Sequence, residues 1–217
     1  YIKRVPIREY RKQRRGGKGL TGADTKEEDF IRDIFVASAH QYILFFSNRG
    51  QVYWRKVHEI PKGSRTARGR AIRQILDLKD EERVTACLPV RDLNEENKFV
   101  FMVTRKGIVK KTELSAFSNP RSTGIRAIEL DKDDELVDIQ ITSGNDNILI
   151  ATWRGMAIRF PEKDVRPMGR AAQGVIGIRL EADDYVIGTS IAHDNMTVLS
   201  VTENGYGKRT QAEEYRV

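Results

Sequence analysis

At 217 residues with 39% apolar content, the chain can bury a core and has the size of one large domain or two small ones. Its 38 Lys and Arg exceed its 31 Asp and Glu, and the net charge of +7 favours a polyanionic partner. The single cysteine, Cys87, excludes an internal disulfide and a thiolate metal cage and fits a reducing compartment, and apolar runs such as 42–46 are too short to span a bilayer.

A basic, glycine-rich loop occupies residues 13–19, which read Gln-Arg-Arg-Gly-Gly-Lys-Gly. Glycine lets a backbone approach a surface closely, while Arg and Lys supply the charge that phosphates attract. Taken alone, the loop is also compatible with a solvated turn, so its surroundings must decide. The chain opens on Tyr1 in mid-pattern, and we expect it to be a fragment of a larger subunit whose true N-terminus is missing.

Internal repetition organises the rest of the chain. Apolar runs that end in a glycine-bearing turn and then resume as a basic strand occur at 42–50, 99–107, 148–155 and 198–205. The turn glycines Gly50, Gly107, Gly155 and Gly205 are 57, 48 and 50 residues apart. Residues 1–11 reappear as 206–216, so both ends of the chain lie in the same phase of the repeat.

Each repeat carries a second landmark, an arginine shortly before a glycine. The pairs are Arg15 and Gly19, Arg65 and Gly69, Arg121 and Gly124, and Arg170 and Gly174. After the landmark we expect an alternating strand, as at 69–76 and 174–180, then an acidic turn at 27–29, 80–82, 133–135 or 183–184, then another strand. Single helical turns are expected at 112–117 and 161–165, and an enlarged hairpin turn at 94–97.

The repeat predicts blades. About four strands in each unit of about 50 residues favour an all-β fold, a propeller or an open spiral of the same kind. No linker rich in Pro, Gly or Ser divides the chain. We therefore predict one domain over residues 1–217, with about four blades and the start of a fifth.

Charge follows the same period. Basic residues outnumber acids by eight to one in 1–22 and in 49–73 and by six to one in 105–126, whereas acids prevail in 24–33 and 129–138. Because the same part of each repeat occupies the same edge of a ring, the basic segments predict a continuous band from which the acids are displaced. Charges placed for solubility alone would instead be interspersed.

A curved basic band suits duplex DNA. A duplex bent along it would meet Lys and Arg at each blade and release counterions without base readout. Smooth bending of a short site costs about 1–6 kcal/mol, so contacts must recur along the path. Aromatic residues are sparse near the basic loops, which argues against single-strand stacking as the main mode.

Residues 13–19 resemble the GyrA box, the signature of the C-terminal domain of the A subunit of bacterial DNA gyrase, and the strand starts at 49–54 and 154–159 are similar to that family too. The resemblance implies a β-pinwheel, in which blades exchange strands. It also implies a non-catalytic domain that wraps duplex DNA with positive handedness and so enables ATP-driven negative supercoiling by a type IIA topoisomerase. The box residues that would bind DNA are Gln13, Arg14, Arg15, Gly16, Gly17, Lys18 and Gly19. On other blades we expect DNA contacts from Lys3, Arg4, Arg65, Arg68, Arg70, Arg121, Arg126 and Arg170.

The resemblance implies partners as well. They would be duplex DNA and, in a heterotetrameric holoenzyme, the N-terminal part of the A subunit with the gyrase B subunit. It implies a cytoplasmic, nucleoid-associated location without membrane contact. No cofactor is expected in this domain, because the parent enzyme uses ATP and magnesium elsewhere. The chain departs from the family in having fewer repeats than a whole domain and no acidic C-terminal tail.

Two alternative functions stay open. The equivalent domain of topoisomerase IV shares the blades but carries a degraded box, and the intact segment 13–19 argues against it. A propeller that serves as a protein-interaction platform would be expected to show WD-type signatures, and the sequence has none.

No residue is predicted to be catalytic or to bind a metal. Tyrosines that recur in phase with the blades, which is typical of packing residues, are Tyr1, Tyr10, Tyr53, Tyr206 and Tyr215. The three histidines lack metal-ligand spacing, and 17–19 lacks the Ser or Thr and the full glycine spacing of a P-loop. Trp54 and Trp153 are expected to pack between blades.

Overall fold

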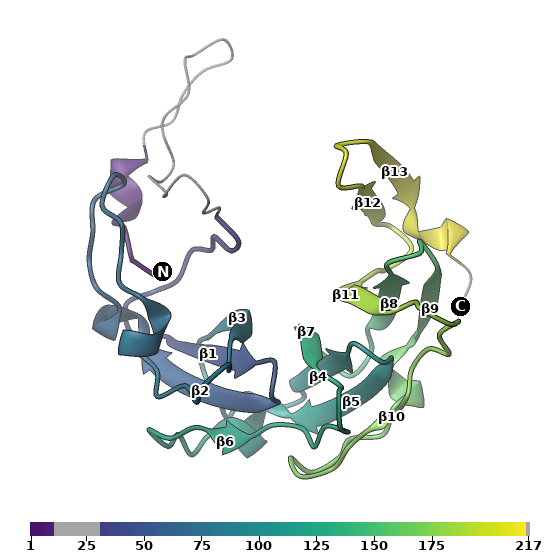
Figure 1. The fold of residues 1–217 in the computed structure, drawn as a ribbon, viewed down its shortest axis with the longest axis horizontal. Coiled ribbons are helices and arrows are strands. Elements are labelled where there is room, and N and C mark those ends of the chain that lie inside the picture. The colour runs from purple at the N-terminus through teal and green to yellow at the C-terminus, as the bar shows by residue number, and fades with distance from the viewer. Residues whose placement is uncertain (11–30, 216–217) are drawn as a thin grey trace.

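Antiparallel hairpins repeat along the chain and follow one another round an open arc (Figure 1). The computed structural model describes residues 1–10 and 31–215, so the basic loop 13–19 and the acidic turn 27–29 lie outside the described residues. The hairpins are β1 (Tyr42–Ser47) with β2 (Gln51–Lys56), β4 (Phe99–Thr104) with β5 (Ile108–Glu113), β8 (Asn147–Thr152) with β9 (Ala157–Pro161), and β12 (Thr197–Val201) with β13 (Gly207–Gln211). The four predicted strand-turn-strand runs are therefore confirmed.

Strands from elsewhere in the sequence extend these hairpins. On the inner side of the arc, β3 (Val84–Val90), β7 (Leu136–Thr142) and β11 (Val186–Ile191) pair with β1, β4 and β8 (Figure 1). On the outer side, β6 (Ile125–Arg126) pairs with β2, and β10 (Val175–Ile176) pairs with β5. Since β6 follows β5 in the chain and β10 follows β9, each outer strand is donated to the preceding blade, which confirms the strand exchange of a β-pinwheel.

The segments after the Arg–Gly landmarks are not the long strands that their alternation predicts. Within 69–76 the structure has a β-bridge at Arg70 and the 3-10 helix η3 (Ile72–Gln74), and within 174–180 only β10 is a strand. The prediction is wrong because the chain leaves the outer edge of the preceding blade after the landmark. It must then cross to the inner edge of the blade to which the rest of the repeat belongs. During this crossing the alternating apolar residues pack against the blade cores, as Ile178 does.

Short 3-10 helices follow the outer strands of the hairpins. They are η2 (Val57–Glu59), η4 (Leu114–Phe117), η5 (Glu162–Asp164) and η6 (Ala212–Glu214), with η1 (Ile7–Glu9) at the corresponding point of the first repeat. The single helical turns predicted at 112–117 and 161–165 are thus confirmed. The segment between β3 and β4 forms two turns, which agrees with the enlarged turn predicted at 94–97.

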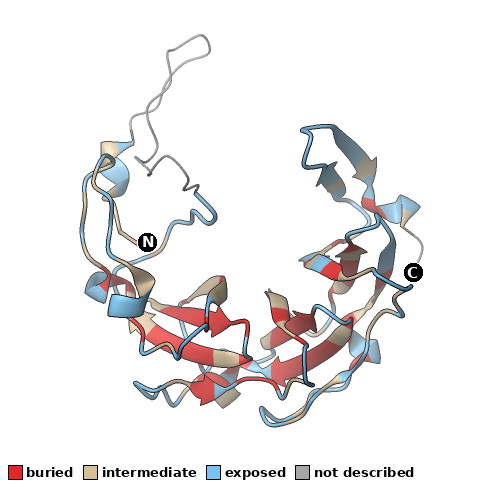
Figure 2. Ribbon diagram, viewed as in Figure 1, coloured by how far each residue is buried: buried red, intermediate tan, exposed pale blue. Residues whose placement is uncertain are grey.

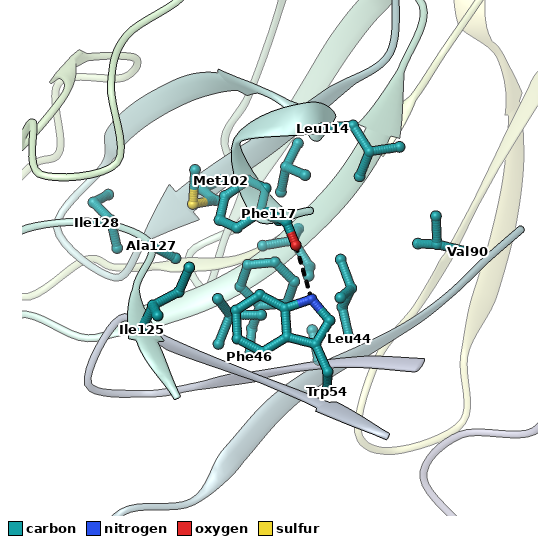
Figure 3. Close-up of a cluster of buried hydrophobic side chains, with 14 of the residues drawn as sticks. Leu44, Phe46, Trp54, Val90, Met102, Leu114, Phe117, Ile125, Ala127 and Ile128 are labelled. Carbon is teal, nitrogen blue, oxygen red and sulfur yellow. Dashed lines mark hydrogen bonds between the residues drawn. The ribbon is translucent and has the colours of Figure 1, made fainter. Parts of the chain in front are cut away.

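Buried residues are concentrated in the first three hairpins, whereas most residues of β12 and β13 are exposed (Figure 2). One cluster joins Leu44, Phe46 and Trp54 of the first hairpin to Met102 and Phe117 of the next blade (Figure 3). Trp54 Nε1 also donates a hydrogen bond to the carbonyl oxygen of Phe117, at 3.0 Å. The relative placement of these two blades therefore depends on both apolar packing and this bond.

Candidate nucleic-acid interface

Each outer strand is preceded by a loop that carries the Arg–Gly landmark. The loops at 118–124 and 166–174 lead into β6 and β10 on the convex side of the arc (Figure 1). The loop at 61–69 has the same relation to the first repeat, where Arg70 bridges to Ile2. Strand exchange therefore brings a loop of this kind to the outer edge at three successive blade junctions.

The glycine that ends each loop is required by its backbone and by its neighbours. Gly69, Gly124 and Gly174 have φ angles of +74°, +73° and +112°, a region that residues with side chains rarely adopt. A Cβ atom on Gly174 would lie 2.4 Å from the carbonyl oxygen of Val109, and one on Gly124 would lie 2.7 Å from the ring of Tyr53. The repeated glycine thus lets the loops at 118–124 and 166–174 press against β2 and β5 of the preceding blade, and the loop at 61–69 press against Ile2.

Arginine side chains are exposed on these loops and on the short outer-edge segments that follow them. The exposed ones, all predicted from the sequence as DNA contacts, are Arg68, Arg70, Arg121, Arg126 and Arg170. Arg65 is half-buried, and Arg126 is paired with Glu129. The structure adds Arg166, which is exposed in the same loop as Arg170 and which sequence reasoning missed because it precedes the landmark. Successive blades therefore present guanidinium groups along one edge, and their contact with DNA stays a prediction.

Two of the predicted contacts have protein partners. Lys3 Nζ donates to the carbonyl oxygens of Arg65 and Ala67, both at 2.5 Å, and Arg4 Nε donates to the carbonyl oxygen of Ile60 at 2.8 Å. Both residues are half-buried. Their charged groups hold the first repeat against the segment 60–67, so they are not presented to a phosphate in the way that the loop arginines are.

The position of Arg4 in the repeat is a contact between blades, which we call the blade clasp. Its counterparts lie four residues after the hairpin glycines, at Trp54, Lys111 and Arg159. Each donates to a carbonyl oxygen at the 3-10 helix of the next blade: Trp54 Nε1 to Phe117, Lys111 Nζ to Glu162 at 2.8 Å, and Arg159 Nη1 to Ala212 at 3.1 Å. An indole, an ammonium and guanidinium groups thus perform the same task, which a search for identical residues would overlook.

The acidic turns lie against the hairpin turns. Asp134 Oδ1 accepts a hydrogen bond from the amide of Lys106 at 3.0 Å, and Arg49 lies 3.5 Å from Glu81. The expectation that acids are displaced from the whole of each basic segment is therefore wrong at the hairpin turns. The physical reason is that the strand returning to the inner edge must pass beside each turn, where its carboxylates bond the turn amides and pair with the turn cations.

The predicted packing of the two tryptophans holds for one of them. Trp54 is buried in the cluster between the first two blades. Trp153 stacks on Tyr185 with ring centroids 5.6 Å apart, but its side chain stays 54% exposed. Arg105 of the preceding blade covers the ring of Tyr185, with its guanidinium carbon 3.6 Å from the centroid. This stack therefore joins two blades at their hairpin turns, with the tryptophan at its solvent end.

The part of the chain that the structure describes holds neither a cluster of metal ligands nor a membrane-spanning helix. Residues 1–10 and 31–215 hold no group of His, Cys, Asp or Glu side chains that could bind a metal ion. His193 instead pairs with Asp146 at 2.9 Å. Within the same ranges, none of the helices has the length and apolar character needed to cross a bilayer.

The family model described as "DNA gyrase C-terminal domain, beta-propeller" matches residues 1–38, 41–91, 98–143, 146–193 and 197–217. The DNA gyrase A subunit of Salmonella typhimurium is 51% identical over 215 residues, which cover 99% of the chain and 24% of that protein. The corresponding protein of Haloquadratum walsbyi is 45% identical over 221 residues, covering 100% and 26%, and that of Staphylococcus aureus is 44% identical over 219 residues, covering 100% and 25%. The chain therefore spans about a quarter of the length of these relatives.

Solved structures share the arrangement of blades. The C-terminal domain of DNA topoisomerase IV gives a TM-score of 0.80 at 28% identity, covering 99% of the chain and 65% of that structure. The DNA gyrase A C-terminal domain gives a TM-score of 0.75 at 28% identity, covering 97% and 68%. The fold therefore does not separate the two enzymes, whereas the three sequence relatives named above are all gyrase A subunits.

Proposed function

Because the chain belongs to the DNA gyrase C-terminal domain family, we propose that it binds duplex DNA along the convex edge of its blades and bends the duplex round that edge. The observation that supports this most strongly is the recurrence of loops with exposed arginines at three successive blade junctions. The planar guanidinium group suits phosphate, and phosphate contacts do not depend on base sequence. Each loop would therefore hold the same kind of duplex at a regular spacing along the arc.

Recurring contacts are what makes a wrap favourable. A straight duplex reaches one point of a convex edge, whereas a bent one reaches several loops. Bending costs about 1–6 kcal/mol for a short site, and each neutralised phosphate adds about 0.9 to the slope of log affinity against log salt. Wrapping by this edge is therefore expected to be steeply salt-dependent.

We assign the fastening of the DNA path to the loop 13–19, in which Arg14, Arg15 and Lys18 form the most cationic copy of the repeated loop. This loop lies outside the described residues, so the assignment rests on its composition and on its phase in the repeat. Within a gyrase, the wrapped DNA would be presented to the strand-passing part, to which the N-terminal part of the A subunit belongs together with the gyrase B subunit. ATP and magnesium would act there, and this domain would contribute binding without chemistry.

Alanine replacement of Arg14, Arg15 and Lys18 in the reconstituted enzyme tests this assignment. Negative supercoiling is expected to disappear, while ATP-dependent relaxation or decatenation survives. Equal loss of all these activities would indicate a folding role for the loop and contradict the assignment. An enzyme that decatenates but never supercoils with the unaltered chain would favour the topoisomerase IV alternative.

Bending can be measured on the chain itself with a duplex that carries a donor dye at one end and an acceptor dye at the other. Binding is expected to raise energy transfer, and the combined replacement of Arg121 and Arg170 by alanine is expected to reduce it. The combined replacement of Lys79 and Lys132 by alanine, which also removes two positive charges from exposed positions beside acidic turns, is the control for lost charge. Binding without any rise in energy transfer, or binding insensitive to salt, would refute the proposal.

A further inference from the structure

Two lysines lie beneath the outer loops and bond the loop backbone. Lys110 Nζ donates to the carbonyl oxygen of Arg170 at 2.6 Å and to that of Ala127 at 2.7 Å. Lys3 Nζ donates to the carbonyl oxygens of Arg65 and Ala67. The two lysines occupy the same position of the repeat. Lys110 is the third residue after the hairpin glycine Gly107, and Lys3 is the third residue of 1–11, the segment that repeats the residues after Gly205.

We propose that Lys3 and Lys110 are loop anchors, positioning residues that draw the carbonyl oxygens of a DNA-binding loop inward and so leave its arginines and amides to face the DNA. The inference rests on the proposed function and adds to it the means by which two loops are held ready for phosphate. Neither lysine needs to touch DNA. Each acts through the loop that it bonds, at 61–69 for Lys3 and at 166–174 for Lys110.

The burial of Lys110 is not explained by packing alone, because an apolar side chain could fill the same space. Its side chain is fully buried, and both of its acceptors in the described structure are main-chain oxygens, with no carboxylate paired to it. Desolvation lowers the pKa of Lys110 to about 8, and the nearby charge of Arg170 acts in the same direction. Methionine would fill similar space without that penalty, so what lysine adds is its N–H donors.

The direction in which loop carbonyls point matters for an anion. A carbonyl oxygen that faced the DNA would repel the phosphate oxygens, whereas an amide N–H or a guanidinium group attracts them. Capture of the Arg170 carbonyl oxygen from below removes one such repulsion. The anchor's own positive charge lies in a medium of low dielectric close behind the loop, where it adds to the attractive potential.

The third loop supplies an internal comparison. At the anchor position of its blade stands Tyr53, whose hydroxyl donates to Glu82 at 2.9 Å and whose ring meets Gly124. The loop at 118–124 thus rests on an aromatic ring and has no ammonium group from this position. Loss of Lys3 should therefore change the loop at 61–69 and leave the loop at 118–124 as it was. Lys110 also bonds Ala127, which closely follows the loop at 118–124, so the loop at 61–69 is the comparison for loss of Lys110.

Methionine variants test the anchors. Lys3→Met and Lys110→Met are compared with Lys79→Met, which removes the same charge from an exposed turn. Amide hydrogen exchange is expected to quicken at 61–69 in the first variant and at 166–174 in the second. It should stay unchanged at 118–124 in Lys3→Met and at 61–69 in Lys110→Met. Affinity for a linear duplex should then fall, and the slope of log affinity against log salt should drop by about 0.9 for each phosphate that is no longer neutralised, relative to Lys79→Met.

A combination of variants separates positioning from general charge. Where Arg166 and Arg170 are both replaced by alanine, the loop has lost the side chains that the anchor presents, so adding Lys110→Met should change duplex affinity little. An undiminished effect in that background would contradict the inference. If Lys110→Met does not fold, the measurements on Lys3→Met decide whether the lysines act as loop anchors. Lys3 is half-buried and lies near the end of the described fold, so its replacement should be tolerated.

The outcomes distinguish this inference from the proposed function. If the unaltered chain does not bind the duplex, the proposed function is refuted and the anchoring role in binding is refuted with it. If the unaltered chain binds and bends the duplex while Lys3→Met and the folded Lys110→Met match Lys79→Met in affinity and salt slope, only the anchors are refuted.

Discussion

Replacing Lys111 by methionine is expected to destabilise the chain by about 3–5 kcal/mol, the usual cost of leaving a buried charge unpaired. Lys111 Nζ lies 3.8 Å from a carboxylate oxygen of Glu162, and the two side chains are 4% and 0% exposed. Glu162 also accepts hydrogen bonds from Thr142 Oγ1 at 2.7 Å and from the amide of Asp146 at 2.9 Å. Methionine has similar bulk, so the loss should come from the stranded carboxylate more than from a cavity.

The double variant Lys111→Met with Glu162→Gln tests that cause. Glutamine can keep a bond to the Asp146 amide and one to the Thr142 hydroxyl while it carries no charge. The remaining cost should be about 1–2 kcal/mol, mainly for the lost bond to the Glu162 carbonyl oxygen. Urea unfolding followed by tryptophan fluorescence measures both variants, provided that the m-value is unchanged. A double variant no more stable than Lys111→Met alone would refute the explanation by buried charge.

Three further predictions concern stability. Gly174→Ala is expected to lower the free energy of unfolding by at least about 1 kcal/mol more than Gly155→Ala does, as measured by thermal unfolding. Both glycines have positive φ, but only at Gly174 would the new Cβ atom lie 2.4 Å from a carbonyl oxygen. Equal losses in the two variants would contradict this. Trp54→Phe is expected to lower the free energy of unfolding by about 1–3 kcal/mol, because it removes the hydrogen-bond donor to the Phe117 carbonyl oxygen. A loss within about 0.5 kcal/mol, as at ordinary surface sites, would show that the blade clasp is dispensable at Trp54. Between pH 8 and 10.5 the native chain has released the Lys110 proton, whereas the unfolded chain still holds it. The free energy of unfolding should therefore rise with pH across this window, by up to about 3 kcal/mol relative to Lys110→Met. A difference between the two proteins that does not change with pH would contradict the lowered pKa.

The repeat could be predicted from the sequence because its signals are local. The runs at 42–50 and 99–107 each combine a strand, a glycine turn and a second strand, and the structure has a hairpin at each. The strand exchange was implied only by the family resemblance, since nothing local to 125–126 states that it pairs with β2. The alternation at 69–76 misled for a related reason, because apolar residues that pack during a crossing have the same period as those of a strand.

The partners of individual cations could not be predicted, because they are main-chain atoms far away in the sequence. Lys110 bonds carbonyl oxygens 17 and 60 residues away, and Lys3 bonds carbonyl oxygens 62 and 64 residues away. From composition alone, such lysines are counted as surface charges that could contact a phosphate. Arg121 and Arg170, by contrast, lie in loops whose glycine already indicated a tight turn, and the structure leaves them exposed.

Relaxation of closed circular DNA by a type I topoisomerase in the presence of the chain is the most direct test of the account. Wrapping along the convex edge predicts that, after the protein is removed, the distribution of linking numbers is shifted from that of DNA relaxed alone. The positive handedness that the family resemblance implies would place this shift toward positive values. The shift should grow with the ratio of protein to DNA and vanish as salt is raised. A distribution identical to that of DNA relaxed without the chain, at concentrations where binding is complete, would contradict wrapping.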